Sequence, residues 1–162
     1  GRREADFRVL SMQILSYQPQ YAQYFELLNK EWLQKHFYIE PIDEYVLTHP
    51  QEAILDKGGR ILFAEYNGDI IGTIALLPIN SSEIEFIKMG VNENYQGLGA
   101  GKLLFAAAIQ TAKEMGMKKV ILYSNKGLSP ALTIYRKHGF VEVPVEEHVH
   151  YERCNIKMEL VL

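Results

Sequence analysis

Gln96-Gly97-Leu98-Gly99-Ala100-Gly101-Lys102 is the stretch that decides the fold of this chain. It follows an apolar run that is predicted to be a strand, and it opens an amphipathic helix. The first N–H groups of a helix have no partner within the helix, and the helix dipole adds partial positive charge there. Glycines let the main chain approach a ligand closely. The loop therefore predicts a binding site for a phosphate or a pyrophosphate.

Two familiar phosphate-binding patterns fail on this glycine loop (residues 96–102). The dinucleotide fingerprint Gly-x-Gly-x-x-Gly requires a glycine where Lys102 stands. The Walker pattern fits Gly101 and Lys102, but Gln96 replaces its first glycine, and Leu103 replaces the hydroxyl residue that would bind magnesium. A third pattern, Gln/Arg-x-x-Gly-x-Gly/Ala, is met in full by Gln96, Gly99 and Gly101.

With two further segments, this third pattern resembles the GCN5-related N-acetyltransferase (GNAT) superfamily. Glu85-Phe86-Ile87-Lys88-Met89-Gly90-Val91 is similar to the central strand of the family. Asn125, followed by Ala131-Leu132-Thr133-Ile134-Tyr135-Arg136-Lys137-His138-Gly139-Phe140, resembles its second signature. The resemblance covers residues 12–162 and implies an α/β acyl-CoA N-acyltransferase fold, with a single mixed, mostly antiparallel central sheet flanked by helices. It also implies one N-acetyltransferase domain over residues 1–162.

The resemblance implies acetyl-CoA as cosubstrate and assigns its binding to three places. Main-chain groups at the end of the central strand would pair with the pantetheine arm, and one N–H would polarise the thioester carbonyl. The glycine loop would hold the pyrophosphate, and an asparagine would contact the pantetheine. The predicted cofactor-binding residues are Met89, Gly90, Val91, Gln96, Gly97, Leu98, Gly99, Ala100, Gly101, Lys102 and Asn125.

Two of these cofactor-binding assignments have open alternatives. Lys102 is equally well explained as a solvated lysine in the first turn of the helix. Asn125 lies six residues before Ala131, whereas the common family spacing is three residues, and Leu128 occupies that place.

The predicted catalytic residues are Glu85 and Tyr135, both implied by the resemblance. Glu85 would accept the proton of an ammonium substrate, directly or through water, and Glu83 on the same face is its rival. Tyr135 would donate a proton to the leaving thiolate. The simpler interpretations are an exposed or substrate-anchoring carboxylate and a core tyrosine, and a tyrosine can both pack and serve chemistry.

Periodicity and turn residues predict the order of elements around the loop. Asn67-Gly68 is a strong hairpin signal, Asp43 is expected to cap a short helix, and Ser129 is expected to cap a later one. The expected strands are residues 12–17, 61–66, 70–77, 82–91, 119–123, 140–143 and 154–162. The expected helices are residues 21–35, 43–49, a start at 50–55, one from the loop to about 115, and 129–138.

Alternation in the strand at residues 82–91 predicts two faces. One face would carry Ile84, Phe86 and Lys88, and the opposite face Glu85, Ile87 and Met89.

Composition limits the classes of function. A formal net charge of −3 gives no footprint for nucleic acid, and no apolar stretch reaches the length of a membrane span. The single cysteine, Cys154, excludes an internal disulfide framework and is expected to be a small buried residue in the last strand. With no signal-like N-terminus, we expect a soluble, cytoplasmic protein. Residues 1–10 are expected to be disordered or of cloning origin, since Gly1 stands where native chains carry Met.

No metal site is expected. The five histidines give only the cluster His148-x-His150 with Glu146 and Glu147, which is interpreted as a solvated loop.

The acceptor pocket is expected between the N-terminal helices and the last hairpin. Acidic residues there would attract an ammonium group, whereas Arg153 would suit a substrate carboxylate. The residues considered are Trp32, Phe37, Tyr38, Glu40, Asp43, Glu44 and 151–153. The sequence thus predicts an acetyl-CoA-dependent N-acetyltransferase for a primary amine of a small molecule, amino acid or protein, with a homodimer as a further expectation. A non-catalytic acyl-CoA-binding sensor or interaction module is the alternative.

Overall fold

A seven-stranded sheet in the order β1-β2-β3-β4-β5-β7-β6 runs through the computed structural model, which describes residues 11–147 and 153–162. Among the described strands, only the pair of β4 and β5 is parallel. The strands are β1 (Met12–Ser16), β2 (Arg60–Tyr66), β3 (Asp69–Pro78), β4 (Glu83–Val91), β5 (Lys119–Ser124), β6 (Val141–Val143) and β7 (Ile156–Val161). The prediction of a mixed, mostly antiparallel sheet is confirmed. The expectations for residues 1–10, His148, His150 and Tyr151 lie outside the described residues.

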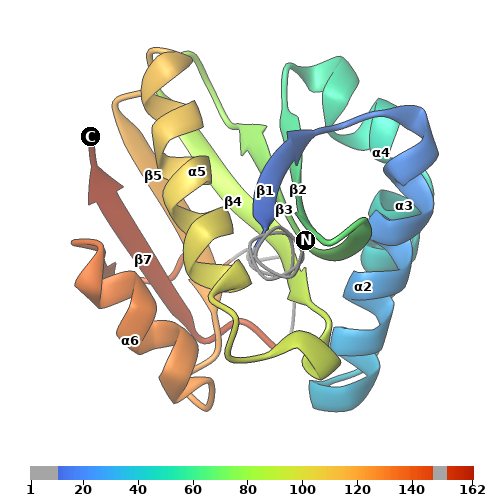
Figure 1. Cartoon of the computed structure of the whole chain (residues 1–162). Coiled ribbons are helices and arrows are strands. Elements are labelled where there is room, and N and C mark those ends of the chain that lie inside the picture. The colour runs from blue at the N-terminus through green and yellow to red at the C-terminus, as the bar shows by residue number, and fades with distance from the viewer. Residues whose placement is uncertain (1–10, 148–152) are drawn as a thin grey trace.

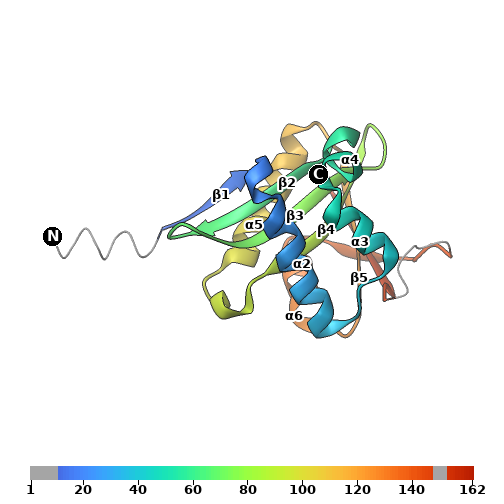
Figure 2. The same cartoon turned by 90° about the vertical axis from the view of Figure 1, so that its right-hand side faces the viewer.

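Helices cover both faces of this sheet, as Figures 1 and 2 show. One face carries α2 (Ala22–His36), α3 (Pro41–Thr48) and α4 (Pro50–Ala53), which bury Phe25, Leu33 and Leu47 against β2 and β3. The other face carries α5 (Ala100–Glu114) and α6 (Ser129–Lys137), which bury Leu104 and Leu132. The described part of the chain also contains three short 3-10 helices, η1 (Pro19–Tyr21), η2 (Leu55–Lys57) and η3 (Glu93–Tyr95). Each apolar helix stripe thus finds a sheet face to cover.

The β2–β3 hairpin follows the sequence prediction. Tyr66 pairs with Asp69, so Asn67 and Gly68 form a two-residue turn with φ angles of 50° and 90°. Asn-Gly suits such a turn because both positions need positive φ.

Strands β4 and β5 pair along only a short part of their length. Their parallel register joins Glu83 to Lys119, Ile84 to Val120 and Glu85 to Ile121, and it ends there although both strands continue. Beyond Glu85, the two strands separate. A gap therefore opens in the middle of the sheet, at the carboxyl end of its only parallel pair among the described residues.

A β-bulge in β4 lies beside this gap. Thr73 pairs with Gly90 and Ala75 pairs with Ile87, so Lys88 and Met89 together oppose one residue of β3. Lys88 takes a left-handed φ of 53°, and the extra residue reverses the alternation after it.

The predicted faces of β4 are therefore wrong at two positions. Met89 packs with the core under α5, on the same side as Ile84 and Phe86. The ammonium of Lys88 instead bonds to Asp43 of α3, on the opposite side. Simple alternation cannot anticipate this, because a bulge inserts one residue without changing the apolar pattern before it.

Two predicted helix caps are also corrected. Glu40 is the N-cap of α3, and Asp43 is the N3 partner of a capping box, its carboxylate accepting the Glu40 N–H at 2.9 Å. The N-cap of α6 is Leu128, no side chain caps this helix, and Ser129 is its first residue. In both cases, a proline allows the helix to begin earlier than the polar residue suggested.

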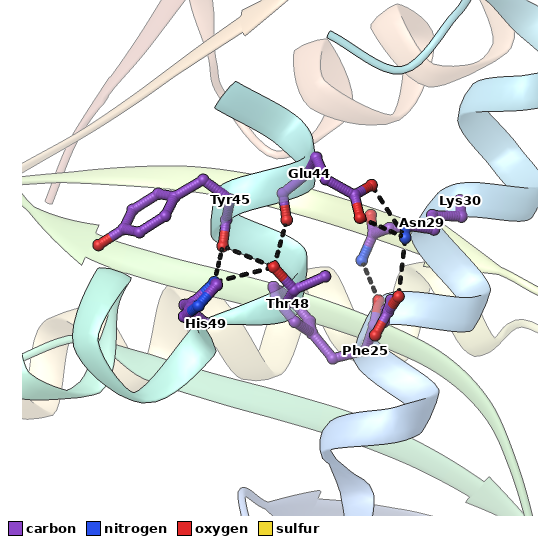
Figure 3. A network of polar contacts seen from close by, with 8 residues as sticks. Phe25, Asn29, Lys30, Glu44, Tyr45, Thr48 and His49 are labelled. Atoms are coloured by element: carbon purple, nitrogen blue, oxygen red, sulfur yellow. Dashed lines mark hydrogen bonds and ion pairs between the residues drawn. The ribbon is translucent and has the colours of Figure 1, made fainter. Parts of the chain in front are cut away.

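Polar contacts join helix α3 to α2, as Figure 3 shows. Lys30 of α2 bonds to Glu44 of α3 at 2.9 Å and to Glu26 at 2.7 Å. Asn29 is buried and donates to the Phe25 carbonyl within α2. The N-terminal turn of α3 is thereby held over β4, beside the gap in the sheet.

In the described part of the chain, no helix combines the length and the apolar character that crossing a membrane requires.

Candidate functional site

A cavity of about 510 Å³ occupies the gap between β4 and β5. Its walls come from α2, β4, β5, α6 and the segment before β7. Predicted site residues that line it are Glu85, Met89, Gly90, Val91, Gln96, Asn125 and Tyr135. The structure thus brings both predicted catalytic residues and the end of β4 into one cavity. The rest of the glycine loop, residues 97–102, is outside the lining and follows Gln96 directly.

The glycine loop has the main-chain geometry of an anion site. Gly97 and Gly99 have φ angles of 87° and 83°, and Gly99 is the N-cap of α5. A Cβ atom placed on either glycine would meet no atom within 4 Å, so open space faces this main chain. The Leu103 N–H donates to the Gly99 carbonyl at 3.0 Å, which is the first hydrogen bond of α5. The helix N–H groups before Leu103 have no carbonyl partner within the helix. This exposed turn of amides fits a pyrophosphate.

The loop lies close to the bulged strand and beside α6. A Cβ on Gly101 would lie 3.6 Å from the terminal methyl of Met89, so α5 begins close to the bulged strand. Lys102 is exposed and lines a separate hollow between α5 and α6 together with Lys137. Lys102 is not among the residues that line the cavity between β4 and β5.

Glu85 stands where β4 and β5 separate, and its carboxyl faces the cavity. Burial raises the pKa of Glu85 from 4.5 to about 7, partly opposed by the nearby Lys88 and Lys157 ammonium groups and reinforced by Glu146. A carboxyl with a pKa near neutrality can take up and release a proton at physiological pH. This is the electrostatic property that a general base requires.

Glu83, the rival base, is in different surroundings. It forms an ion pair with Lys119 at 2.9 Å and is not part of the cavity lining. Hydrogen bonds from Lys119 and Asn80 hold the pKa of Glu83 below its usual value. The geometry therefore favours Glu85 over Glu83 as the proton acceptor.

Tyr135 combines packing with access to the cavity. Its ring packs against Phe105, with centroids 5.2 Å apart, while the residue also lines the cavity. Burial raises the pKa of the Tyr135 phenol, and a hydrogen bond with the Ser124 side chain partly opposes this. The phenol thus stays protonated and able to donate. The core and functional interpretations of this tyrosine are compatible.

Asn125 uses its side chain within the protein. Its Nδ2 donates to the Arg153 carbonyl at 2.7 Å, and its Oδ1 accepts the Gly127 N–H at 2.8 Å. The residue lines the cavity and joins the end of β5 to the segment before β7.

The acidic residues expected to attract an ammonium group are already paired. Arg153 bonds to Glu40 at 2.7 Å and to both oxygens of Asp43, at 2.8 and 3.0 Å. Asp43 is fully buried and also accepts the Lys88 ammonium. Burial acts to raise the pKa of Asp43, but hydrogen bonds from Arg153 and Lys88 outweigh it and keep this pKa low. Glu44 is bound to Lys30.

Sequence reasoning missed a second charged group beside Glu85. The Tyr123 hydroxyl and the Lys157 ammonium both bond to the Glu146 carboxylate. These bonds, that of Lys157 first, lower the pKa of Glu146 to about 2, while burial and the bond to Glu146 raise that of Tyr123. No local motif marks this group, since its members lie on β5, on β7 and in the segment after β6.

Aromatic residues of α2 and the segment after it form another part of the cavity wall. Trp32 packs against Phe37 with ring centroids 5.7 Å apart, and both line the cavity together with His36. Cys154 is a partly buried cavity residue that precedes β7, which corrects the expectation of a buried residue within the strand. Within residues 11–147 and 153–162, no three or more His, Cys, Asp and Glu side chains gather in a way that would hold a metal ion.

Comparisons with known proteins agree with one another. A model of the acetyltransferase (GNAT) family matches residues 21–140. Mycothiol acetyltransferase from Corynebacterium glutamicum is 31% identical over 107 residues, covering 66% of this chain and 36% of that protein. The chain spans about half or less of the length of the curated relatives it matches first.

Solved structures share the fold across nearly the whole chain. An acetyltransferase of the GNAT family from Staphylococcus aureus Mu50 superposes with a TM-score of 0.81 at 22% identity, covering 92% of this chain and 98% of that one. The PaiA N-acetyltransferase from Thermoplasma acidophilum, solved with coenzyme A, gives 0.71 at 20% identity, with coverage of 94% and 99%.

Proposed function

Because the chain belongs to the acetyltransferase (GNAT) family, we propose that it transfers an acetyl group from acetyl-CoA to a primary amine. The amine would belong to a small molecule, an amino acid or a protein. The observation that carries this proposal is Glu85, a carboxyl with a pKa of about 7 that shares one cavity with Tyr135 and the bulged end of β4.

Acetyl-CoA supplies the activated acetyl group, and main-chain atoms of this chain would hold it. The amides of residues 97–102 suit the pyrophosphate, because their glycines leave open space before the loop. The edge of β4 from Met89 to Val91 faces the gap where β5 no longer pairs with it, so an extended pantetheine arm can bond there as an added strand. The relative solved with coenzyme A supports this choice of cosubstrate.

Glu85 and Tyr135 would move the two protons of the reaction. The Glu85 carboxylate accepts the proton of the substrate ammonium, and the neutral amine then attacks the thioester carbonyl carbon. A main-chain N–H of β4 stabilises the negative oxygen that forms. The Tyr135 phenol then gives its proton to the departing sulfur. The attacking nitrogen carries a positive charge after attack and loses its second proton, which restores the Tyr135 phenol by way of water. Glu85 releases the first proton to solvent, so the products are the amide, the free thiol and one proton.

The acceptor side of the cavity narrows the form of the amine. The aromatic wall of Trp32 and Phe37 suits an apolar body. Arg153 is committed to Glu40 and Asp43, so it offers a substrate carboxylate less than an uncommitted arginine would. These features support an amine with apolar substituents, whether free or at the end of a peptide.

Thiol release from acetyl-CoA with a panel of amines tests the proposal, with mass spectrometry of a treated metabolite extract to find the acetylated product. We expect turnover with at least one apolar primary amine. Tight coenzyme A binding without turnover on any amine would instead favour a non-catalytic acyl-CoA sensor. Absence of coenzyme A binding would contradict both functions.

A further inference from the structure

The bulge residue Lys88 adopts a main-chain conformation that its side chain disfavours. Its φ of 53° lies in the left-handed region, where a Cβ atom crowds the following carbonyl oxygen. Bulges of this kind usually place glycine at such a position. Something in the surrounding structure must therefore hold Lys88 in place.

Asp43 makes the contact that holds it. The Lys88 ammonium bonds to Asp43 Oδ1, and the two side chains are 5% and 0% exposed. The remaining capacity of this carboxylate is taken by the Arg153 guanidinium and by the Glu40 N–H. A buried carboxylate with four donors has one orientation, so the Lys88 ammonium has one position as well.

Asp43 itself is fixed by its helix. It belongs to the capping box that starts α3, and its neighbour Glu44 binds α3 to Lys30 of α2. The main chain of α2 in turn packs on the bulged strand, because a Cβ on Gly90 would come within 3.1 Å of the Leu28 carbonyl oxygen. Packing by α2 and the bond from α3 therefore both hold the bulge in place.

We propose that Asp43 is a positioning residue, which holds the Lys88 ammonium so that the left-handed turn at Lys88 aims the main chain of residues 89–91 into the cavity. The inference rests on the proposed function, because the aimed groups are those that would bind the pantetheine arm. Asp43 does not itself line the cavity.

A matched pair of variants separates conformation from charge. Lys88→Ala and Lys88→Gly both remove the ammonium and leave Asp43 paired with Arg153, but only glycine accepts positive φ without strain. We measure affinity by calorimetry for coenzyme A and for 3′-phospho-ADP, its half without the pantetheine arm. Lys88→Ala should weaken coenzyme A binding about tenfold and leave 3′-phospho-ADP binding unchanged. Lys88→Gly should keep both affinities within about threefold of the original protein.

Asp43→Asn tests the residue itself. It should reproduce the selective loss of coenzyme A affinity, and adding Lys88→Gly should restore most of it. Asp56→Asn, which removes an exposed carboxylate that bonds to Gln51 rather than to Lys88, is the control and should change neither affinity. Equal coenzyme A affinities of Lys88→Ala and Lys88→Gly, or no rescue of a folded Asp43→Asn protein, would overturn the inference.

Amide hydrogen exchange in the free protein keeps this inference distinct from the proposed function. Lys88→Ala should speed exchange of the Asn92 amide, which bonds to the Ile71 carbonyl at 2.8 Å just beyond the bulge, and Lys88→Gly should not. If the unaltered protein does not bind coenzyme A, the proposed function fails, whereas the exchange rates still decide whether Lys88 is held. Equal exchange in the two variants would overturn the inference on its own.

Discussion

The two ends of the site use different kinds of chemical group, the main chain at the glycine loop and side chains at Glu85. At the glycine loop, the main chain provides the binding groups, and the side chains of Gly97 and Gly99 are absent so that a ligand can approach. At the other end, the functional groups are side chains from elements far apart in the sequence, and burial raises the pKa of the Glu85 carboxyl. The first end depends on local conformation, and the second depends on tertiary packing.

This difference separates binding from chemistry. A change at the loop should alter affinity for coenzyme A and leave proton transfer intact in whatever complex still forms. A change at Glu85 should slow proton transfer and leave the affinity for coenzyme A unchanged. Substitutions at the loop and at Glu85 should therefore have independent effects.

Replacing Glu85 should have the largest effect. Glu85→Gln keeps the shape of the side chain but removes the proton acceptor, so we expect kcat/KM to fall by about 10²- to 10⁴-fold. The Kd for coenzyme A should not change. Steady-state kinetics and calorimetry on the same preparation measure the two quantities.

Glu83→Gln is the control for this prediction. It removes a carboxylate two residues away that is paired with Lys119, outside the cavity lining. Activity should stay close to that of the original protein. If the two substitutions have equal effects, Glu85 has no special role.

Adding a side chain at Gly99 in the loop should have the next largest effect. Gly99→Val fills the open space before the loop that the pyrophosphate would occupy, so coenzyme A affinity should fall about 100-fold, or about 2.8 kcal/mol. It also places a β-branched residue at a φ of 83°, which should lower the stability of the fold. Gly116→Val is matched to it, since Gly116 also has positive φ, at 78°, and open space around it. Both variants should lose stability, and only Gly99→Val should lose affinity. Unchanged affinity in a folded Gly99→Val protein would remove the loop from the site.

Tyr135→Phe should have the smallest effect. Thiols are far more acidic than alcohols, as the cysteine pKa of about 8.5 illustrates, so the sulfur of coenzyme A can leave as thiolate and losing the phenol should lower kcat by only about tenfold. Coenzyme A affinity should hardly change. Tyr95→Phe is the control, because the Tyr95 hydroxyl bonds to Asp69 and lies outside the cavity lining. A purely structural tyrosine would instead reduce thermal stability and leave kcat unchanged.

The same contrast explains which features could be predicted from the sequence. The glycine loop, the Asn67-Gly68 turn and the helix ending at Gly139 depend on neighbours along the chain, and each is found where the sequence places it. The mixed, mostly antiparallel sheet follows from the family resemblance that these local motifs support.

The charged groups could not be predicted in this way. Asp43 bonds to Lys88 across 45 positions of sequence and to Arg153 across 110, so neither contact leaves a local pattern. The sequence predicts a helix cap at Asp43 because that role depends only on its neighbours along the chain. The bulge at Lys88 was missed because its alternation looks regular until the pairing with β3 is known.

The pH dependence of kcat, at saturating acetyl-CoA and amine, tests the central claim about Glu85 most directly. The carboxylate is the active form, and its pKa is raised to about 7, so kcat should fall as pH drops below 7 and level off above it. The Tyr135 phenol, with its pKa raised, should stay protonated through this range. Glu85→Gln should lack the inflection near pH 7 altogether. An identical inflection in both proteins, or a midpoint near the ordinary value for a glutamate, would contradict the claim that Glu85 is the base.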